Sequence, residues 1–311
     1  MEARMDVHVR PTLTAYQLSP LVSRTSSART RHLRHMYTAA AYLVPLVGAC
    51  AAFVRAGREG IGAVEIVSLT SMYLVTLLGI TVGYHRGLSH RAFRAQPALE
   101  AILLALGAMA GHGPVLRWVA DHRRHHQFAE RAQDPHSPND GFWHAHVGWL
   151  FTSSISNTLY YCRDVIRNPR ARFIGWTYPF WFVAGILLPG LGAYVVTRDS
   201  AALVSGALWG GFVRLALCAQ ATFSVNSLCH MWGRRPFATN DRSTNLAWLA
   251  VPTLGEAWHN NHHAEPSHAH FGMHPWQVDI GGLFIAAMAR IGWITHVHGA
   301  QCESRKPHED E

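Results

Sequence analysis

Four long stretches of this 311-residue chain are almost free of charged residues, and they limit the folds that it can adopt. Each is close to the roughly 20 apolar residues that a helix needs to cross a bilayer. Short polar turns join the first stretch to the second and the third to the fourth. The sequence therefore predicts an all-α integral membrane protein with four transmembrane helices in two hairpins, at residues 37–54, 62–84, 176–197 and 202–226.

The distribution of charge predicts how these helices are oriented. The formal net charge is +8, which a nucleic-acid-binding protein could share. However, only Arg55, Arg58 and Arg198 fall in the two turns between hairpin partners. The other basic residues that flank the spans lie on the opposite side, which the positive-inside rule assigns to the cytoplasm. We therefore expect both termini and residues 85–175 to be cytoplasmic, with lipid and not nucleic acid as the surroundings.

The remaining segments complete the predicted organisation. Residues 1–36 are polar and rich in Arg and Ser, which indicates a flexible basic arm, and residues 301–311 form a polar tail. Between them, residues 37–300 form one membrane domain. The apolar segment 98–116 is interpreted as a helix on or under the membrane, because a fifth crossing there would separate the histidine-rich segments onto opposite faces. Segment 278–297 is interpreted in the same way.

Three histidine-rich segments border the apolar stretches: HRGLSH at 85–90, HRRHH at 122–126 and HNNHH at 259–263. In the last two, positions i, i+3 and i+4 share one face of a helix, so their imidazoles point the same way. His85 and His90 are about 140° apart on an α-helix, and they can share a face only if the helix ends there. The segments contain eight candidate metal ligands: His85, His90, His122, His125, His126, His259, His262 and His263.

These histidines favour a metal centre at the membrane surface. Imidazole is a good ligand for iron, zinc, copper and nickel, and eight imidazoles exceed what one ion accepts, so two ions are predicted. A metal transporter would carry histidines and carboxylates within its spans, and a haem protein would carry axial histidines within facing helices. Neither pattern is present, which favours redox chemistry and leaves a membrane metal-binding or transport protein as the alternative.

The order of the motifs resembles that of the membrane fatty acid desaturases, and the stearoyl-CoA (delta-9) type most. The likeness rests on HRGLSH, DHRRHH, DPHSPNDGFWHAHVGWLF, NSLCH and GEAWHNNHH around two hairpins. It implies a mostly helical protein whose cytosolic cap holds two non-haem iron ions (Fe2+) with nine histidines. The ninth would be His230 of NSLCH. Asn226 of the same segment would hold one iron through a water molecule.

The resemblance also implies a reaction. The chain would be an oxidoreductase that uses O2 and two electrons to place a cis double bond, at the delta-9 position, in a saturated acyl chain on coenzyme A. Cytochrome b5, ferredoxin or rubredoxin, with its reductase, would supply the electrons. An acyl-lipid desaturase, an acyl-carrier-protein desaturase and a membrane diiron hydroxylase or ketolase remain alternatives.

Substrate contacts follow from the same resemblance. Trp118 and Thr222 would shape a bend in the acyl tunnel beside the metals, and Asp121 would contact a ligand or the head group. His112 stands where relatives usually have Gln. The residues after GWL carry no charge, whereas relatives that use acyl-CoA have basic residues there, so the carrier stays open. Four further residues are expected to orient the ligands or to support the structure around them, with direct metal coordination as the alternative: Asp134, His136, His144 and His146.

Overall fold

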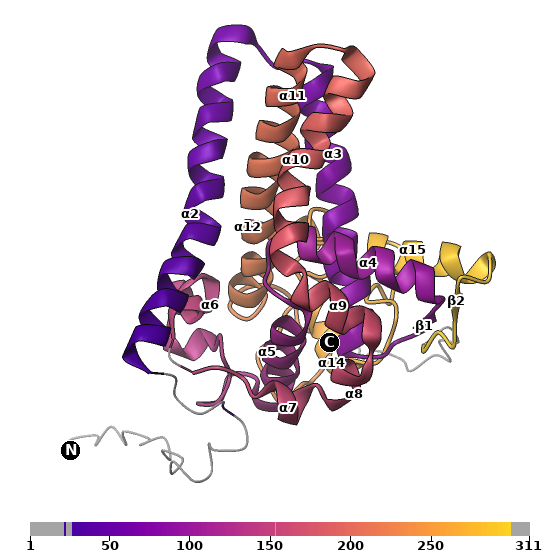
Figure 1. Cartoon of the computed structure of the whole chain (residues 1–311). Helices are drawn as coiled ribbons and strands as arrows, with labels where there is room; N and C mark the ends of the chain where they lie inside the picture. Colours follow the sequence, from indigo (N-terminus) through magenta and orange to yellow (C-terminus); the bar gives the residue numbers. More distant parts are fainter. Residues whose placement is uncertain (1–21, 23–26, 153, 300–311) are drawn as a thin grey trace, which may run out of the picture.

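A bundle of four long helices dominates the computed structural model, which describes residue 22 and residues 27–152 and 154–299. In Figure 1 these helices stand side by side, and the shorter helices gather at one end. The bundle consists of α2 (Ala28–Glu59), α3 (Ala63–Leu78) with the π-helix η1 (Gly79–Ser89), α10 (Tyr178–Thr197), and α11 (Ser200–Gly206) with the π-helix η4 (Ala207–Val213) and α12 (Arg214–Leu228). All four are long and apolar enough to cross a membrane, as the sequence predicts.

Helix α2 begins earlier than expected. The side chain of Ser27 accepts a hydrogen bond from the backbone N–H of Thr30 at 3.2 Å and so caps the helix. A helix that leaves the apolar layer can continue in water when its first N–H groups are capped. The prediction that residues 28–36 belong to a flexible arm is therefore wrong. The rest of that predicted arm, apart from residue 22 and Ser27, and the predicted tail 301–311 lie outside the described residues.

A buried arginine ties the bundle together. Arg214 lies on α12 with no exposed surface. Its guanidinium donates to the carbonyl oxygens of Gly210 (3.0 Å), Met109 (2.6 Å) and Gly185 (2.6 Å). A charge within a membrane domain is expected to face the bundle interior and to be fully hydrogen-bonded, and Arg214 meets both conditions. It links three helical segments: α4 (Pro97–Met109), α10 and the η4–α12 junction.

Helix α4 packs against η1 and is shorter than the helices that could cross a membrane. Its 13 residues span about 20 Å, which is too short for the hydrocarbon layer. The expectation of four spans and not five is confirmed. The close packing needs a glycine, because a Cβ atom on Gly79 would lie 2.1 Å from the backbone nitrogen of Gly107.

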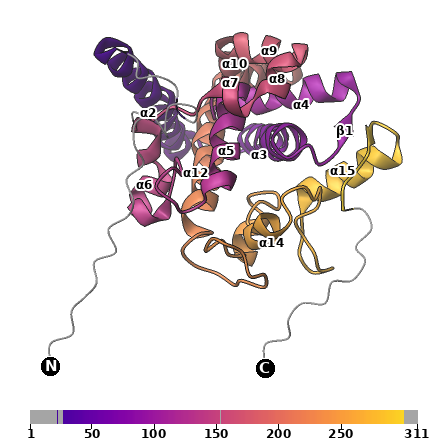
Figure 2. The ribbon, with the colours of Figure 1, turned by 90° about the horizontal axis from the view of Figure 1, so that it is seen from below.

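The short helices form a cap at one end of the bundle, which Figure 2 shows from below. They are α5 (Val115–Phe128), α6 (Phe142–His146), α7 (Thr158–Tyr161), α8 (Arg163–Arg167), α9 (Pro169–Trp176), α13 (Ala247–Ala250) and α14 (His259–Ala264), with the 3-10 turns η2 (Pro138–Asp140) and η3 (Gly148–Phe151). Helix α15 (Ile280–Arg290) is a further short apolar helix. Strands β1 (Arg94–Ala95) and β2 (Ile294–Thr295) pair antiparallel and join the segments before α4 and after α15.

Candidate metal centre

The nine predicted histidine ligands converge in the cap and form two groups. Within each group, one ligand atom from every residue lies within 4.8 Å of the others. The five-histidine group consists of His85, His90, His122, His126 and His262. The four-histidine group consists of His125, His230, His259 and His263. Two clusters of nitrogen donors from distant parts of the chain therefore lie next to each other.

Helices α5 and α14 each contribute to both groups. On α5, His122 and His126 face one group and His125 faces the other. On α14, His262 belongs to the five-histidine group, whereas His259 and His263 belong to the four-histidine group. The spacing i, i+3, i+4 covers a helix face wide enough for this division. Each triplet thus bridges two candidate metal positions.

The π-helix η1 explains how His85 and His90 come together. The backbone N–H of His90 donates to the carbonyl of His85, five residues earlier, at 3.1 Å. This i→i+5 bond is the π-helical pattern, which places residues five apart one turn from each other. The ring centroids of the two histidines are 4.9 Å apart. The 140° separation expected for an α-helix does not apply to this segment.

Carboxylates hold the other ring nitrogen of four of the histidines. The Nδ1 atom of His125 lies 3.0 Å from Asp134, that of His230 lies 3.0 Å from Glu130, and that of His263 lies 2.7 Å from Asp241. Glu256 holds the Nδ1 atom of His85 in the same way. A carboxylate at Nδ1 fixes the proton there and leaves Nε2 as a free donor for a metal.

The Nε2 atoms left free are the strongest sign that cations belong here. In the four-histidine group, the Nε2 atoms of His125 and His263 are buried without a hydrogen-bond partner among the described residues. In the other group, His90 Nε2 lies 2.7 Å from His122 Nε2, and His262 Nε2 lies 2.9 Å from His126 Nε2. Lone pairs that converge in a buried space repel each other, and a metal ion removes that repulsion. The residues present therefore fit two metal ions.

Burial keeps most of these imidazoles neutral. It lowers the pKa values of His122, His126 and His262 well below the usual range, and neighbouring histidines lower them further. Burial also lowers the pKa of His263 to about 4. His125 differs, because the Asp134 carboxylate outweighs burial and raises its pKa. Since the neutral form of imidazole binds metal, the centre is suited to metal binding at neutral pH.

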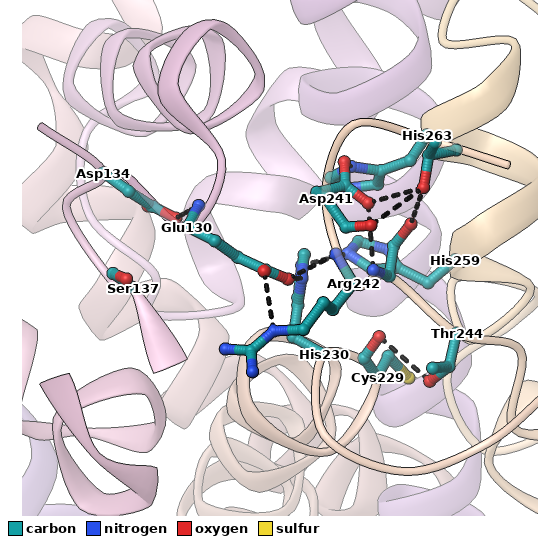
Figure 3. A network of polar contacts seen from close by, with 12 residues as sticks. Glu130, Asp134, Ser137, Cys229, His230, Asp241, Arg242, Thr244, His259 and His263 are labelled. Carbon is teal, nitrogen blue, oxygen red and sulfur yellow. Dashed lines mark hydrogen bonds and ion pairs between the residues drawn. The ribbon is translucent and has the colours of Figure 1, made fainter. Parts of the chain in front are cut away.

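Two of the carboxylates that hold histidines also pair with arginines: Glu130 with an exposed arginine and Glu256 with a buried one. Glu130 accepts from Arg242 Nε at 2.9 Å while it holds His230, and Figure 3 shows both side chains beside the Glu130 carboxylate, where Arg242 contacts Oε2 and His230 contacts Oε1. Glu256 lies 3.5 Å from Arg86, a fully buried side chain that also pairs with Asp279 at 2.9 Å. These ion pairs fix the carboxylates, and the carboxylates in turn fix the rings.

Three cavities that share lining residues lie between helices α2 and α12 of the bundle and the histidines. The outer cavity, of about 220 Å³, lies between α2 and α12 and is mostly apolar. It shares Tyr42 and Phe223 with a middle cavity, which contains His112, Asp121 and Trp149. The middle cavity shares four residues with an inner cavity that reaches Leu77 and Ile80. The shared residues are Trp118, His122, Thr222 and Asn226.

The residues expected at the substrate line these cavities. Trp118 stacks on His122 with ring centroids 5.1 Å apart, and Thr222 and Asn226 lie with it at the junction of the middle and inner cavities. His112 and Asp121 line the middle cavity, where Asp121 accepts a hydrogen bond from Arg117. These residues therefore lie in the cavity walls beside the histidines, and their contact with a substrate stays a prediction.

The four residues expected to orient the ligands behave differently. Asp134 orients a ligand, because it holds the Nδ1 atom of His125. His136 stacks on the His125 ring with centroids 4.3 Å apart. His146 instead bonds Gln220 and Ser227, both at 3.0 Å, and so fastens α6 to α12. His144 lies 3.9 Å from Asp140 near the surface. The contacts of His144 and His146 do not orient the metal ligands, whereas those of His146 are structural, which is one of the roles expected for it.

Sequence reasoning missed three of the four carboxylates that hold histidines: Glu130, Asp241 and Glu256. Glu256 had a usable signal, because it lies three residues before His259 in the same motif. Glu130 lies four residues after His126, beyond the end of α5. Asp241 lies in a loop with no local pattern, and only the folded chain brings it to His263.

Comparison with known proteins identifies the family. The family model described as fatty acid desaturase matches residues 63–299. The chain is 37% identical to a hex-5-enoyl-[acyl-carrier protein] acetylenase of Moorena producens, over 82% of this chain and 83% of that protein. It is 39% identical to delta-9 acyl-lipid desaturase 2 of Arabidopsis thaliana, over 72% of each chain, and 36% identical to an sn-1 stearoyl-lipid 9-desaturase of Anabaena variabilis, over 74% of this chain and 82% of that protein. With its four membrane helices and its paired histidine groups, the chain belongs to the membrane fatty acid desaturase family.

Proposed function

We propose that this fatty acyl desaturase holds two non-haem Fe2+ ions with its nine histidines and uses O2 to place a cis double bond at the delta-9 position. One observation carries the proposal: two groups of buried imidazoles adjoin a series of cavities that is open to an acyl chain. Imidazole donors suit iron. The delta-9 position is named for two of the relatives in the comparison.

The reaction explains why a metal centre is required. A –CH2–CH2– unit, O2, two electrons and two protons give a –CH=CH– unit and two molecules of water. The hydrogens leave unactivated methylenes, which no side-chain acid or base can attack. Iron with O2 supplies that oxidising power, while the protein supplies binding, orientation and exclusion of side reactions.

The chain's own residues would position the acyl chain. Trp118 is held against His122, so its indole can form one wall of the path beside the five-histidine group. Thr222 forms part of the wall at the same junction. Leu77 and Ile80 close the apolar end of the inner cavity. A chain that bends at Trp118 would present one carbon pair to the centre, which is how the position of the double bond would be selected.

The electrons would come from a separate protein. We propose that the histidine centre and both termini face the cytoplasm, because the flanking arginines lie on that side of the spans. A donor such as cytochrome b5, ferredoxin or rubredoxin, with its reductase, would dock there. The positive formal charge of the chain would attract an acidic donor.

Lipid analysis of a host that expresses the chain tests the proposal. The host should gain a cis-9 monounsaturated fatty acid, and a host that expresses the His262→Ala variant at the same level should not. A new hydroxy or keto fatty acid would establish a hydroxylase or ketolase instead. Metal flux into vesicles that contain the protein, without any change of the acyl chains, would favour transport.

A further inference from the structure

A group of arginines lies beside the middle cavity and has no role in the metal centre. Arg117 of α5 donates from Nε to Asp121, a buried carboxylate that lines this cavity. Arg34 of α2 lies close enough to be repelled by Arg117 and by Arg31 and to be attracted by Asp121. Three guanidinium groups thus lie near one another, and two of them, those of Arg117 and Arg34, interact with the Asp121 carboxylate of the cavity wall.

Arg34 is held in place without an acidic partner of its own. Its terminal nitrogen donates to the carbonyl oxygen of Thr152 at 2.6 Å, and its Nε atom is buried without a partner within the described part of the chain. Neutral carbonyl oxygens orient a guanidinium but do not neutralise it. Arg34 also forms no ion pair with any carboxylate that the structure describes. Its charge is therefore held in position by neutral partners, and no carboxylate among the described residues neutralises it.

These arginines lie at the outer end of the acyl route. Arg31 precedes Tyr42 by 11 residues, about three helical turns, so both lie on the same face of α2. Tyr42 lines the outer and middle cavities. Next to Arg34, the ring of His35 packs on Phe151, another wall of the outer cavity, with centroids 6.2 Å apart. The apolar end of the route, at Leu77 and Ile80, lies in the inner cavity.

We propose that Arg31, Arg34 and Arg117 bind a phosphate of the group that carries the acyl chain. The inference rests on the proposed function. The planar fork of arginine donors matches phosphate oxygens and forms short, charge-assisted hydrogen bonds with them. An acyl chain anchored there leads into the apolar cavities. Because the segment after GWL is uncharged, α2 and α5 supply the positive charge that this segment lacks.

Phosphate is present in coenzyme A, in the phosphopantetheine of an acyl-carrier protein and in a phospholipid head group, whereas a galactolipid has none. The first measurement is binding, so it does not depend on turnover. Non-reactive ether or thioether analogues of the four carriers, with one alkyl chain length, are titrated into the detergent-solubilised, iron-loaded protein. At least one phosphate-bearing analogue should bind more tightly than the galactolipid analogue, and the tightest one identifies the carrier.

The variants separate charge from shape. Arg34→Gln should weaken binding of that analogue about tenfold, which equals about 1.4 kcal/mol, and should leave the galactolipid analogue unchanged. Arg34→Lys should recover part of the loss. Arg58→Gln, at the other end of α2, should bind like the wild type. Equal affinities of Arg34→Gln and Arg58→Gln, or tightest binding of the galactolipid analogue, would overturn the inference.

Turnover of the same carriers separates this inference from the proposed function. If the inference holds, Arg34→Gln raises KM for the preferred carrier about tenfold and changes kcat little, because the arginine contacts the carrier and not the reacting carbons. Desaturation with the same KM in the wild type and in Arg34→Gln would overturn the inference and leave the function standing. Binding that depends on Arg34, without desaturation of any carrier, would support the inference and contradict the proposed function.

Discussion

The Nε2 atoms of His85 and His262 lie 3.0 Å apart, although the two residues are 177 positions apart in the chain. His262 Nε2 also lies 2.9 Å from His126 Nε2. One imidazole of α14 therefore faces donors from η1 and from α5. The five-histidine group depends on this contact, because His262 is its one member from the C-terminal part of the chain.

Replacing His262 should remove one metal ion and not both. The His262→Ala variant leaves the four-histidine group with all its members, so the iron content should fall from two toward one per chain while desaturation stops. Elemental analysis of the purified protein measures the change. His144→Ala, at a surface histidine of α6, is the matched control and should keep two irons. Two irons in His262→Ala would contradict the assignment.

Glu256 should control metal affinity although it is not a ligand. Glu256→Gln keeps the shape of the side chain but weakens its hold on His85 and removes its charge beside Arg86. Loss of such a partner typically costs 10–100-fold in metal affinity, and we expect a loss of about that size. Competition with a chelator measures it. Glu59→Gln, at the far end of α2, should lose metal like the wild type.

Arg214 should matter for stability and not for metal binding. Arg214→Gln leaves the carbonyl oxygens of Met109 and Gly185 without their donors inside the bundle. Unsatisfied buried groups cost about 1–3 kcal/mol each, so the free energy of unfolding should fall by about 3 kcal/mol. Thermal unfolding in detergent tests this. Arg167→Gln, on the surface of the cap, should unfold at the wild-type temperature, and an equal Tm for both variants would refute the role of Arg214.

The sequence predicted the spans and the histidines because both have local signals. Apolar length identifies a membrane helix, and the spacing i, i+3, i+4 identifies a shared face on α5 and α14. The bends and contacts between distant segments have no such signal. The π-helix at His85 follows from how η1 packs on α4, and the position of Asp241 follows from a loop that folds back onto α14.

The start of α2 shows a different limit. Hydropathy marks where a helix enters the apolar layer but not where the helix ends. The polar character of residues 28–36 predicts an arm, whereas the helix begins after the Ser27 cap. This extension places Arg31 and Arg34 beside the cavities, which no hydropathy pattern indicates.

The metal-free protein should become less stable as the pH falls below about 6.5. Burial lowers the pKa of His112 to about 4 and that of His136 to about 3. The unfolded chain takes up protons on these residues near pH 6.5, whereas the folded chain does so only near the lowered values. The contribution of each neutral histidine to the free energy of unfolding is therefore complete above pH 6.5. It falls by up to about 1.4 kcal/mol per pH unit until the pH reaches the lowered pKa, about 4 for His112 and about 3 for His136.

Urea unfolding of the metal-free protein between pH 7.5 and pH 4.5 measures this dependence. The His112→Gln variant lacks one of the buried neutral histidines and should show a shallower loss of stability over the same range. A free energy of unfolding that stays constant from pH 7.5 to pH 5 would mean that these histidines are not buried in neutral form.

Anomalous X-ray scattering at the iron edge, from crystals of protein loaded with Fe2+ under anaerobic conditions, tests the central claim most directly. We predict two peaks, one among the Nε2 atoms of the five-histidine group and one among those of the four-histidine group. A single peak, or peaks away from these imidazoles, would contradict the assignment of two irons to the nine histidines.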